Sequence, residues 1–341
     1  MTKIVESWVK FRKEPLRASF STSLRSVNEL TIVEFHIKTD DGHEVFGETV
    51  ETPAITGDTL AQIEKDLRTV LPEALKNKEF ETAASYFNSH ISKLDVTKSA
   101  KCAVDIALYD LQAIIENRTL GQLLGSSVKH VTTDVTIPLT EISAIPNLIA
   151  ERSDFPALKI KLGKDLVHKN IEKIRLVREI IGIKGLIRVD PNQAWSVEDS
   201  IEFLHHIEKD SLDIEYLEQP ISAHNKVGMA AIRAQCSTKI MADESIYTEA
   251  DLEELVNVQA IDLVNVKIIK SGGITPSIAI IKRAKELGVD FSIGSMMEGD
   301  KGVLGAYLLA GAYKPDYCHD LDAAWWALST RFTYAEGKVS I

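Results

Sequence analysis

Short apolar segments alternate with amphipathic helical patterns over the last two thirds of the chain, and this alternation restricts the fold more than any other feature. The apolar segments are residues 135–139, 157–162, 186–189, 214–217, 240–242, 263–266 and 291–293. Short buried strands separated by helices are typical of a parallel sheet whose strands are joined by crossover helices. The sequence therefore predicts an α/β domain.

Charged residues at the ends of five of these segments favour a closed barrel over an open sheet. They are Lys161, Asp190, Glu218, Asp243 and Lys267, at intervals of 29, 28, 25 and 24 residues. One strand, loop and helix need about that length, and a (β/α)₈ barrel carries its functional residues at the carboxyl ends of its strands. A charge that only solvates a strand end is common for one strand but unexpected for five in register. With Thr136 before the series and Gly294 and Asp320 after it, eight strand ends are predicted.

The first third of the chain has a different pattern. Residues 30–38 are rich in β-branched side chains, an Asp40-Asp41-Gly42 turn follows, and residues 44–48 resume the strand pattern, which predicts a β-hairpin. Three helical patterns follow, at residues 60–71, 80–93 and 99–116. Strands followed by helices favour a separate α+β unit.

Composition and charge exclude several classes of function. The 341 residues include 39 Lys and Arg against 50 Asp and Glu, and the net charge of −11 repels nucleic-acid phosphates and anionic lipids. Three widely spaced cysteines match neither a disulfide framework nor a zinc cluster, which favours a reducing compartment. The N-terminus lacks the apolar region of a signal peptide. We therefore expect a cytoplasmic protein that binds a small molecule and neither nucleic acid nor membrane.

Three consecutive strand ends supply the carboxylates of Asp190, Glu218 and Asp243. In a barrel these groups converge, and three carboxylates so close together need a cation to stay ionised. Oxygen ligands suit Mg²⁺, with Mn²⁺ as a substitute, whereas Zn²⁺ would favour His or Cys ligands. We predict one Mg²⁺ ion per subunit at these residues.

Lysines flank the carboxylates. Residues two apart on a strand share a face, so Lys159 and Lys161 are predicted to point into the barrel, with Lys267 across the ring. The charges of Lys159 and of a metal favour the neutral amine of Lys161, the form that acts as a base. Two bases on opposite faces of a metal-bound carboxylate suit racemisation or epimerisation through an enediolate, although elimination and cycloisomerisation use the same groups. The alternative is that the lysines only form structural ion pairs.

The order and spacing of five motifs resemble those of the muconate-lactonising subgroup of the enolase superfamily. The motifs are Lys159-x-Lys161, Asp190-x-Asn192, Leu217-Glu218-Gln219-Pro220, Met241-Ala242-Asp243-Glu244-Ser245, and Asn265-Val266-Lys267 followed by Lys270-Ser271-Gly272-Gly273. The resemblance implies an N-terminal α+β capping domain over residues 1–125 and a modified TIM barrel, (β/α)₇β, over residues 126–322. It also implies a C-terminal segment, 323–341, that returns toward the cap. The same resemblance makes Asp190, Glu218 and Asp243 the metal ligands and Lys161 and Lys267 the acid/base pair.

The segment His319-Asp320-Leu321-Asp322 bears on which reaction the subgroup match implies. It resembles the Asp-x-Asp of the dipeptide epimerases, in which Asp320 and Asp322 would bind the α-ammonium group of the substrate from one face of the last strand. A succinylbenzoate or a muconate has no such group. The resemblance therefore implies a dipeptide epimerase. Another activity of the subgroup, such as o-succinylbenzoate synthase or N-acylamino acid racemase, and a non-catalytic binding barrel stay open as alternatives.

The same resemblance extends to the substrate pocket. Arg25, in segment 19–27, matches the arginine that binds the glutamyl side chain in L-Ala-D/L-Glu epimerases, and its planar guanidinium suits a carboxylate. This implies L-Ala-L-Glu or L-Ala-D-Glu as substrate, and hence murein peptide metabolism. Other residues implied to contact the substrate are Thr136, Lys159, Ser295 and Met297.

Roles are also expected for several residues adjacent to these. Asn192 is expected to orient a metal ligand or a water molecule, and Glu244 to contact Lys267. Trp325 and Trp326 either wall the pocket or pack elsewhere, as in a contact with the cap. Helix faces on a barrel look alike whether exposed or paired, so the sequence leaves open whether the protein is a homo-oligomer.

Overall fold

A three-stranded antiparallel sheet packed on helices forms the first unit of the chain, in a computed structural model that describes residues 2–314 and 316–341. The strands β1 (Ile4–Ser21), β2 (Ser26–Thr39) and β3 (Glu44–Val50) lie in the order β1-β2-β3. The helices are α1 (Pro53–Thr56), α2 (Leu60–Arg68), α3 (Val70–Leu75), α4 (Ala83–His90), α5 (Lys98–Ile115) and α6 (Leu120–Leu124). We call residues 2–125 the cap. The predicted hairpin is confirmed as β2 and β3.

The central helix of the cap, α5, lies unusually close to β3. A Cβ atom on Gly47 would stand 1.9 Å from the carbonyl oxygen of Ala103, so only glycine permits this approach. The pattern at residues 60–71 is divided into α2 and α3, because Pro72 has no N–H to donate to Arg68 and its ring disfavours a continuous helix.

Seven parallel strands curl into the barrel in the order β11-β10-β9-β8-β7-β6-β5. They are β5 (Val135–Ile137), β6 (Ala157–Lys161), β7 (Leu186–Asp190), β8 (Ile214–Glu218), β9 (Lys239–Ala242), β10 (Leu263–Lys267) and β11 (Asp290–Gly294). Asp320 pairs with Gly294, and β12 (Cys318–His319) pairs with β4 (Val131–Thr133), so the chain closes the ring on its last side. The predicted barrel strands are confirmed.

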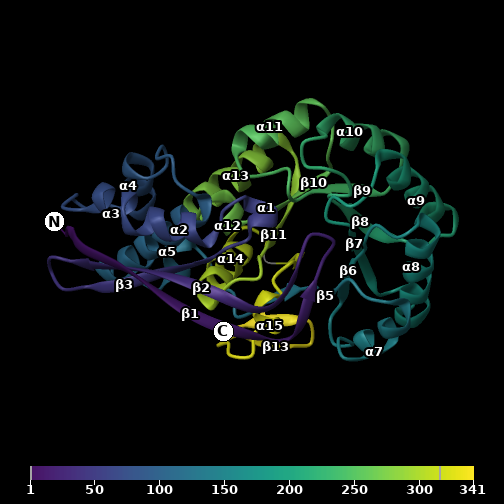
Figure 1. Cartoon of the computed structure of the whole chain (residues 1–341), viewed down its shortest axis with the longest axis horizontal. Coiled ribbons are helices and arrows are strands. Elements are labelled where there is room, and N and C mark those ends of the chain that lie inside the picture. The colour runs from purple at the N-terminus through teal and green to yellow at the C-terminus, as the bar shows by residue number, and fades with distance from the viewer. Residues whose placement is uncertain (1, 315) are drawn as a thin grey trace.

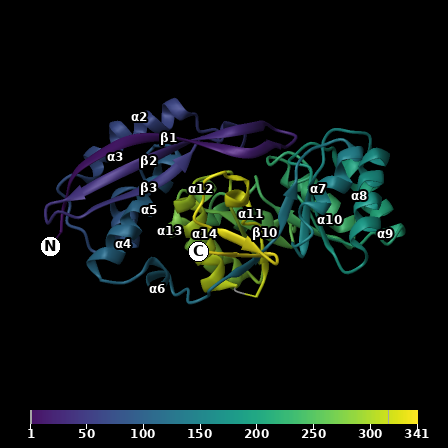
Figure 2. The ribbon, with the colours of Figure 1, turned by 90° about the horizontal axis from the view of Figure 1, so that it is seen from below.

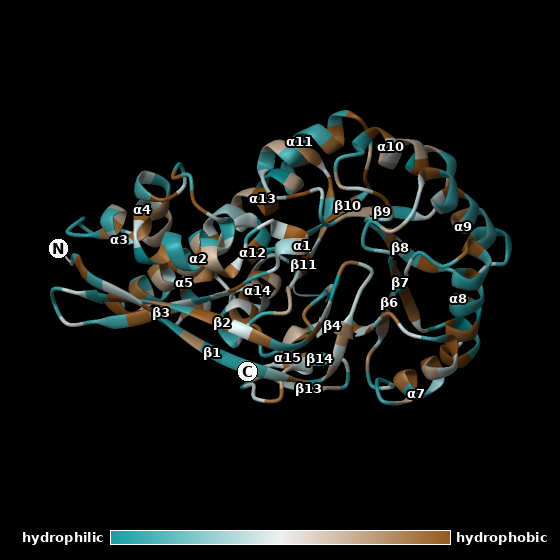
Figure 3. Ribbon diagram, viewed as in Figure 1, coloured by the Kyte–Doolittle hydropathy of each residue, from teal (hydrophilic) through white to brown (hydrophobic). Residues whose placement is uncertain are grey.

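Helices surround the strands of the barrel (Figures 1 and 2). They are η1 (Ile142–Ala144), α7 (Ile145–Ala150), α8 (Val167–Ile181), α9 (Val197–Lys209), α10 (Lys226–Gln235), α11 (Glu249–Asn257), α12 (Ile268–Ser271), α13 (Ile274–Leu287), α14 (Asp300–Tyr313) and α15 (Ala323–Trp326). The outer helices carry both hydrophobic and hydrophilic residues (Figure 3). This is expected of helices with one face on the sheet and one in water. None of the helices described here has the length and apolarity needed to cross a lipid bilayer.

The last residues of the chain contact both units. Strands β13 (Thr333–Ala335) and β14 (Lys338–Ser340) form a hairpin that pairs with β4. Just before it, Ala327 pairs with Leu16 of β1, and Leu328 donates its N–H to the carbonyl of Pro15 at 3.1 Å. The tip of the β1–β2 hairpin extends over the barrel (Figures 1 and 2), where Leu139 donates its N–H to Ser21.

Candidate active site

Three buried carboxylates meet at the carboxyl ends of neighbouring strands. Asp190 ends β7, Glu218 ends β8 and Asp243 follows β9, and one oxygen atom from each lies within 4.8 Å of the others. All three carboxylates are buried, with Asp190 and Glu218 at 0% and Asp243 at 1% exposure. Three buried carboxylates so close together need positive charge to stay ionised, and their oxygen atoms fit a hard divalent cation such as Mg²⁺.

Lysine side chains neutralise these carboxylates. Lys161 is ion-paired with Asp190, and Lys267 Nζ lies 2.9 Å from Asp243 Oδ2. Lys159 Nζ lies 2.9 Å from Glu218 Oε2 and 2.7 Å from Asp320 Oδ2. These side chains form a buried network of alternating charges at the mouth of the barrel, which we call the ladder. Its members are Lys159, Lys161, Asp190, Glu218, Asp243, Lys267 and Asp320.

The ladder shifts the protonation of its members. Burial alone would lower the pKa of Lys267, but the carboxylates of Asp243 and Asp320 raise it well above its usual range. Conversely, burial would raise the pKa of Asp243, but Lys267 and Lys270 hold it below its ordinary value. Opposite charges at close range therefore outweigh desolvation here.

Asn192 and Glu244 lie beside the carboxylates. Asn192, in a left-handed turn with φ of 47°, donates its N–H to Asp190 Oδ1 at 2.8 Å and its side-chain amide to Asp190 Oδ2 at 3.2 Å. The same amide donates to Glu244 Oε1 at 3.1 Å. Burial and the charges of Asp243 and Asp190 raise the pKa of Glu244 to about 8. The expected contact between Glu244 and Lys267 is not formed, because Glu244 lies in the turn after β9 and contacts Asn192, whereas the lysine faces Asp243 and Asp320.

Two residues quoted in the motifs but given no role also contact the ladder. Asn265 donates its side-chain amide to Glu218 Oε1 at 2.9 Å and to Asp320 Oδ2 at 2.8 Å. Asn265 lies two residues before Lys267 on β10, so the alternation of side chains along the strand could have predicted that both residues point into the barrel. Lys270, fully buried on α12, contacts the carboxylate of Asp243. No periodicity reveals that contact, because it depends on how α12 packs against β10 and α5.

Asp320 and Asp322 do not share a face of a regular strand as predicted. Strand β12 ends at His319, and the chain turns at Asp322 into α15, where Asp322 has helical backbone angles. Asp322 Oδ2 accepts hydrogen bonds from Thr136 N–H at 2.7 Å and from Trp326 Nε1 at 3.1 Å. Both aspartates nonetheless line one cavity.

The cavity lies between the ladder and the cap. Its lining from the cap includes Phe20, Thr22, Arg25 and Ile55, and from the barrel Thr136, Lys161, Asn192, Asp243, Lys267, Ser295, Met296, Met297, Asp320, Asp322 and Ala323. Arg25 is mostly buried, which lowers its pKa, and its Nη1 lies 3.4 Å from the carbonyl oxygen of Glu51. Lys159, Asp190, Glu218 and Glu244 lie outside this lining, below the cavity.

One loop and the short helix α1 of the cap are hydrogen-bonded to the barrel above this cavity. The Ser23 hydroxyl lies 2.7 Å from the carbonyl oxygen of Pro191 and 3.0 Å from that of Asn192. On the other side, the Tyr247 hydroxyl donates to the carbonyl of Ile55 at 2.5 Å. The cap is therefore closed over the carboxylates in this structure.

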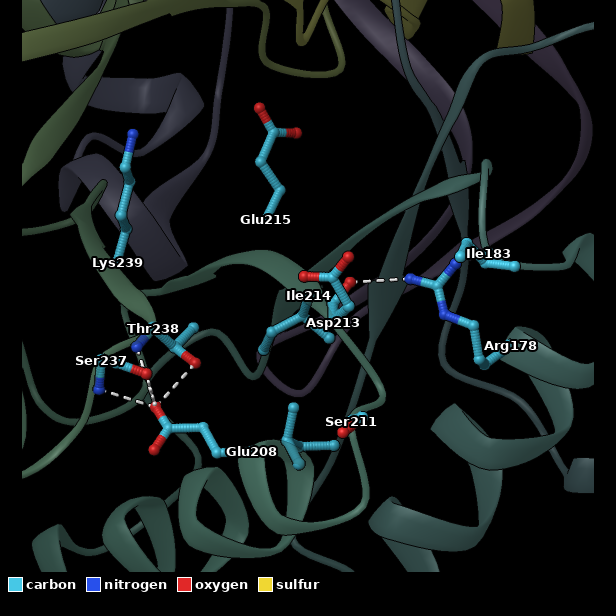
Figure 4. A pocket seen from close by; sticks show the side chains of 11 residues that line it. Arg178, Ile183, Glu208, Ser211, Asp213, Ile214, Glu215, Ser237, Thr238 and Lys239 are labelled. Carbon is cyan, nitrogen blue, oxygen red and sulfur yellow. Dashed lines mark hydrogen bonds between the residues drawn. The ribbon is translucent and has the colours of Figure 1, made fainter.

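A second hollow, of about 560 Å³, lies at the opposite ends of the barrel strands (Figure 4). Of its acidic residues, Glu208 accepts hydrogen bonds from the backbone and hydroxyl groups of Ser237 and Thr238. Arg178 donates to the carbonyl of Asp213 at 2.7 Å. These side chains form hydrogen bonds to loop residues of the protein itself. The ladder therefore remains the better candidate for an active site.

Comparison with known families agrees with the geometry. Residues 4–125 match the family described as mandelate racemase / muconate lactonizing enzyme, N-terminal domain, and residues 145–339 match the family described as enolase C-terminal domain-like. The chain belongs to the enolase superfamily. The predicted family and the predicted modified TIM barrel of this superfamily are confirmed.

Superfamily members similar to this chain include epimerases. The L-Ala-D/L-Glu epimerase of Clostridium acetobutylicum is 34% identical over 314 residues, which cover 90% of this chain and 86% of the relative. The solved substrate-liganded complex of the L-Ala-D/L-Glu epimerase from Bacillus subtilis is 31% identical, with a TM-score of 0.93 over 99% of this chain and 96% of that one. The dipeptide epimerase of Enterococcus faecalis, solved with Mg and L-Leu-L-Tyr, is 29% identical, with a TM-score of 0.89 over 99% and 97% of the two chains.

Proposed function

We propose that the chain is a Mg²⁺-dependent dipeptide epimerase, an isomerase that inverts the α-carbon of the C-terminal residue of a dipeptide. The observation that carries this proposal is the placement of two lysines on one cavity. Lys161 and Lys267 end β6 and β10, which are four strands apart in the sheet, and both line the cavity. The names of the similar superfamily members support the same reaction class.

The lysines carry the proton transfer in this proposal. One, as a neutral amine, takes the α-proton from one face of the substrate, and the other, as an ammonium, gives a proton to the opposite face, so the configuration inverts. Asp190, Glu218 and Asp243 would hold Mg²⁺. When bound, the ion supplies the positive charge that stabilises the negative charge developing on the substrate carboxylate.

Substrate recognition is assigned to groups on the other sides of the cavity. Asp320 and Asp322 would bind the α-ammonium group, with Thr136, Ser295 and Met297 beside the dipeptide backbone. Lys159 contacts Asp320 and would position it instead of meeting the substrate. The partly buried guanidinium of Arg25, which lines the cavity, supports an acidic second residue, hence L-Ala-L-Glu or L-Ala-D-Glu. On this basis we place the protein in murein peptide metabolism in the cytoplasm, where its three free cysteines would stay reduced.

Proton NMR of L-Ala-L-Glu in D₂O, with the protein and Mg²⁺, tests the reaction. We expect loss of the glutamyl α-proton signal together with growth of the L,D diastereomer. Exchange without the L,D product would show that only one lysine acts on this substrate. Absence of exchange with every dipeptide of a panel would contradict the epimerase.

Arg25 tests the choice of the second residue. We expect Arg25→Met to lower kcat/KM for L-Ala-L-Glu about tenfold or more, because a charge-assisted hydrogen bond contributes roughly 1.5–3 kcal/mol. The value for L-Ala-L-Leu should not fall. An equal loss on both dipeptides would contradict the assignment and favour a role in cap closure alone.

A further inference from the structure

A buried arginine lies directly behind the group proposed to bind the substrate's ammonium. Arg152, two residues after α7, is only 2% exposed. Its Nε donates to the carbonyl oxygen of Thr136 at 3.2 Å, and its Nη1 donates to that of Leu148 at 2.9 Å. Arg152 lines a hollow beside α7 and α8 and not the active-site cavity, so it has no direct access to a substrate.

Both hydrogen-bond donors that fix the carboxylate of Asp322 contact Arg152. Thr136 donates its N–H to Asp322 Oδ2, and its carbonyl oxygen accepts a hydrogen bond from Arg152. Trp326 donates its indole N–H to the same oxygen, and its ring centroid lies 5.2 Å from the Arg152 guanidinium carbon. Asp322 Oδ2 is thus fixed from behind, while Asp322 itself lines the cavity.

The indole pair extends this support to the cap. The Arg152 guanidinium carbon lies 4.6 Å from the centroid of Trp325, and that of Arg17, on β1, lies 4.2 Å from the same ring. Phe20 packs edge-on against Trp326 with centroids 5.1 Å apart. The tryptophans therefore pack between the barrel and the cap, and do not line the cavity.

The burial of Arg152 needs an explanation. Its ion-pair partner, Glu151, is 64% exposed in its side chain, and the buried carboxylate of Asp322 offsets the charge without direct contact. Burying a guanidinium without a buried partner is unfavourable. Backbone carbonyls and indole faces replace the lost water, and these are the groups that position Asp322.

We propose that Arg152 is a positioning residue for substrate binding: it holds Thr136 and Trp326 so that Asp322 presents its carboxylate to the α-ammonium group. This inference rests on the proposed function. It adds that Arg152, which does not contact the substrate, helps the enzyme to distinguish a dipeptide with a free N-terminus from one with a blocked N-terminus.

The test compares L-Ala-L-Glu with N-acetyl-L-Ala-L-Glu, which has no ammonium group, in wild type and in Arg152→Met. We expect KM for the free dipeptide to rise about tenfold with kcat changed less than twofold, and the preference for the free over the acetylated dipeptide to fall about tenfold. Arg152→Lys should restore part of that preference. A merely structural role would lower kcat/KM for both substrates equally, and that result would overturn the proposal.

Two further variants keep the test decisive. Arg17→Met removes the cation on the cap side of Trp325 and leaves Thr136 unchanged. We expect the preference for the free over the acetylated dipeptide to change less than twofold in this variant.

A second variant applies if Arg152→Met does not fold, as judged by circular dichroism. Trp326→Phe removes the indole donor to Asp322 and should lower the preference for the free dipeptide. An unchanged preference would overturn the proposal. A wild type that exchanges no dipeptide proton would remove the proposed function as well. An active wild type with an unchanged preference in the variants would remove only the role of Arg152.

Discussion

At the scale of single residues, His319 shows how a buried group can limit stability without taking part in catalysis. Both ring nitrogens are used: Nδ1 accepts the N–H of Ile293 at 3.1 Å, and Nε2 lies 2.9 Å from the carbonyl oxygen of Lys314, to which it donates. Burial lowers the pKa of His319 to about 4. The ring is therefore neutral in the folded protein at neutral pH.

This shift predicts a loss of stability in acid. Between pH 6.5 and pH 4 the unfolded chain binds a proton at His319 and the folded protein does not, so acidification favours unfolding. From pH 7 to pH 5 the contribution is about 2 kcal/mol. Urea unfolding at the two pH values should show that His319→Gln loses about that much less stability than wild type over this interval. An identical pH dependence of the two proteins would contradict the assignment.

Single-lysine variants separate the two faces of the proposed reaction. Lys161→Ala and Lys267→Ala should each reduce epimerisation about 10³-fold, because a positioned acid or base contributes roughly 10²–10⁴ in rate. Each variant keeps one base, so each should still exchange the α-proton of one epimer in D₂O without inverting it. NMR on the separate L,L and L,D dipeptides measures this. Exchange of the same epimer by both variants would contradict opposed bases.

At the scale of elements, the sequence predicted the helices and strands that have a hydrophobic pattern within their own residues. The apolar segments and their charged ends predicted the strands from β5 to β11, because each strand is buried and ends at the mouth of the barrel. Strand β1 was missed, since an edge strand with side chains such as Lys10, Arg12 and Lys13 lacks a continuous apolar face. Strand β12 has two residues and no pattern. The contacts of Arg152 were missed because they depend on the residues after α7 meeting α15, which no local pattern encodes.

Strand β12 is held by an arginine from across the barrel. Arg188, fully buried on β7, donates to Asp134 Oδ2 at 2.7 Å and to the carbonyl of Cys318 at 2.7 Å, and to Glu215 Oε2 at 2.7 Å. It lies beneath the ladder and ties the last side of the ring to the middle of the sheet.

We expect Arg188→Met to lower the free energy of unfolding by roughly 3–5 kcal/mol, since it leaves Asp134 as an unpaired buried charge. Urea denaturation measures the change. Arg175→Met, which breaks an exposed pair with Asp210, serves as control and should cost less than about 1 kcal/mol. Addition of Asp134→Asn to Arg188→Met should restore part of the loss, and a double variant no more stable than the single one would contradict the pairing.

At the scale of the whole molecule, the cap and the barrel share one site, and their closure depends on few hydrogen bonds. Ser23 contacts the turn that follows the carboxylate of Asp190, and Tyr247 contacts Ile55 in α1. One contact lies on a loop and the other on a helix of four residues, and such short segments open with little loss of buried apolar area.

Removal of either contact should weaken closure. Ser23→Ala and Tyr247→Phe should each raise KM about fivefold, because one hydrogen bond contributes about 1 kcal/mol. Hydrogen–deuterium exchange should speed up in residues 19–27 and 52–60 respectively. Ser85→Ala, which removes an exposed hydrogen bond on α4, is the matched control. Unchanged exchange in the two segments would show that other contacts hold the cap.

The pairing of Leu16 with Ala327 also has a consequence for biosynthesis. These partners are 311 residues apart, so the first strand of the cap emerges from the ribosome long before the residues that contact it. A nascent chain that has reached only Gly294 carries the three carboxylates and both lysines, yet lacks Asp320, Asp322 and the tryptophans behind them. Translation therefore supplies the two lysines proposed to transfer protons before the two aspartates proposed to bind the substrate's ammonium group.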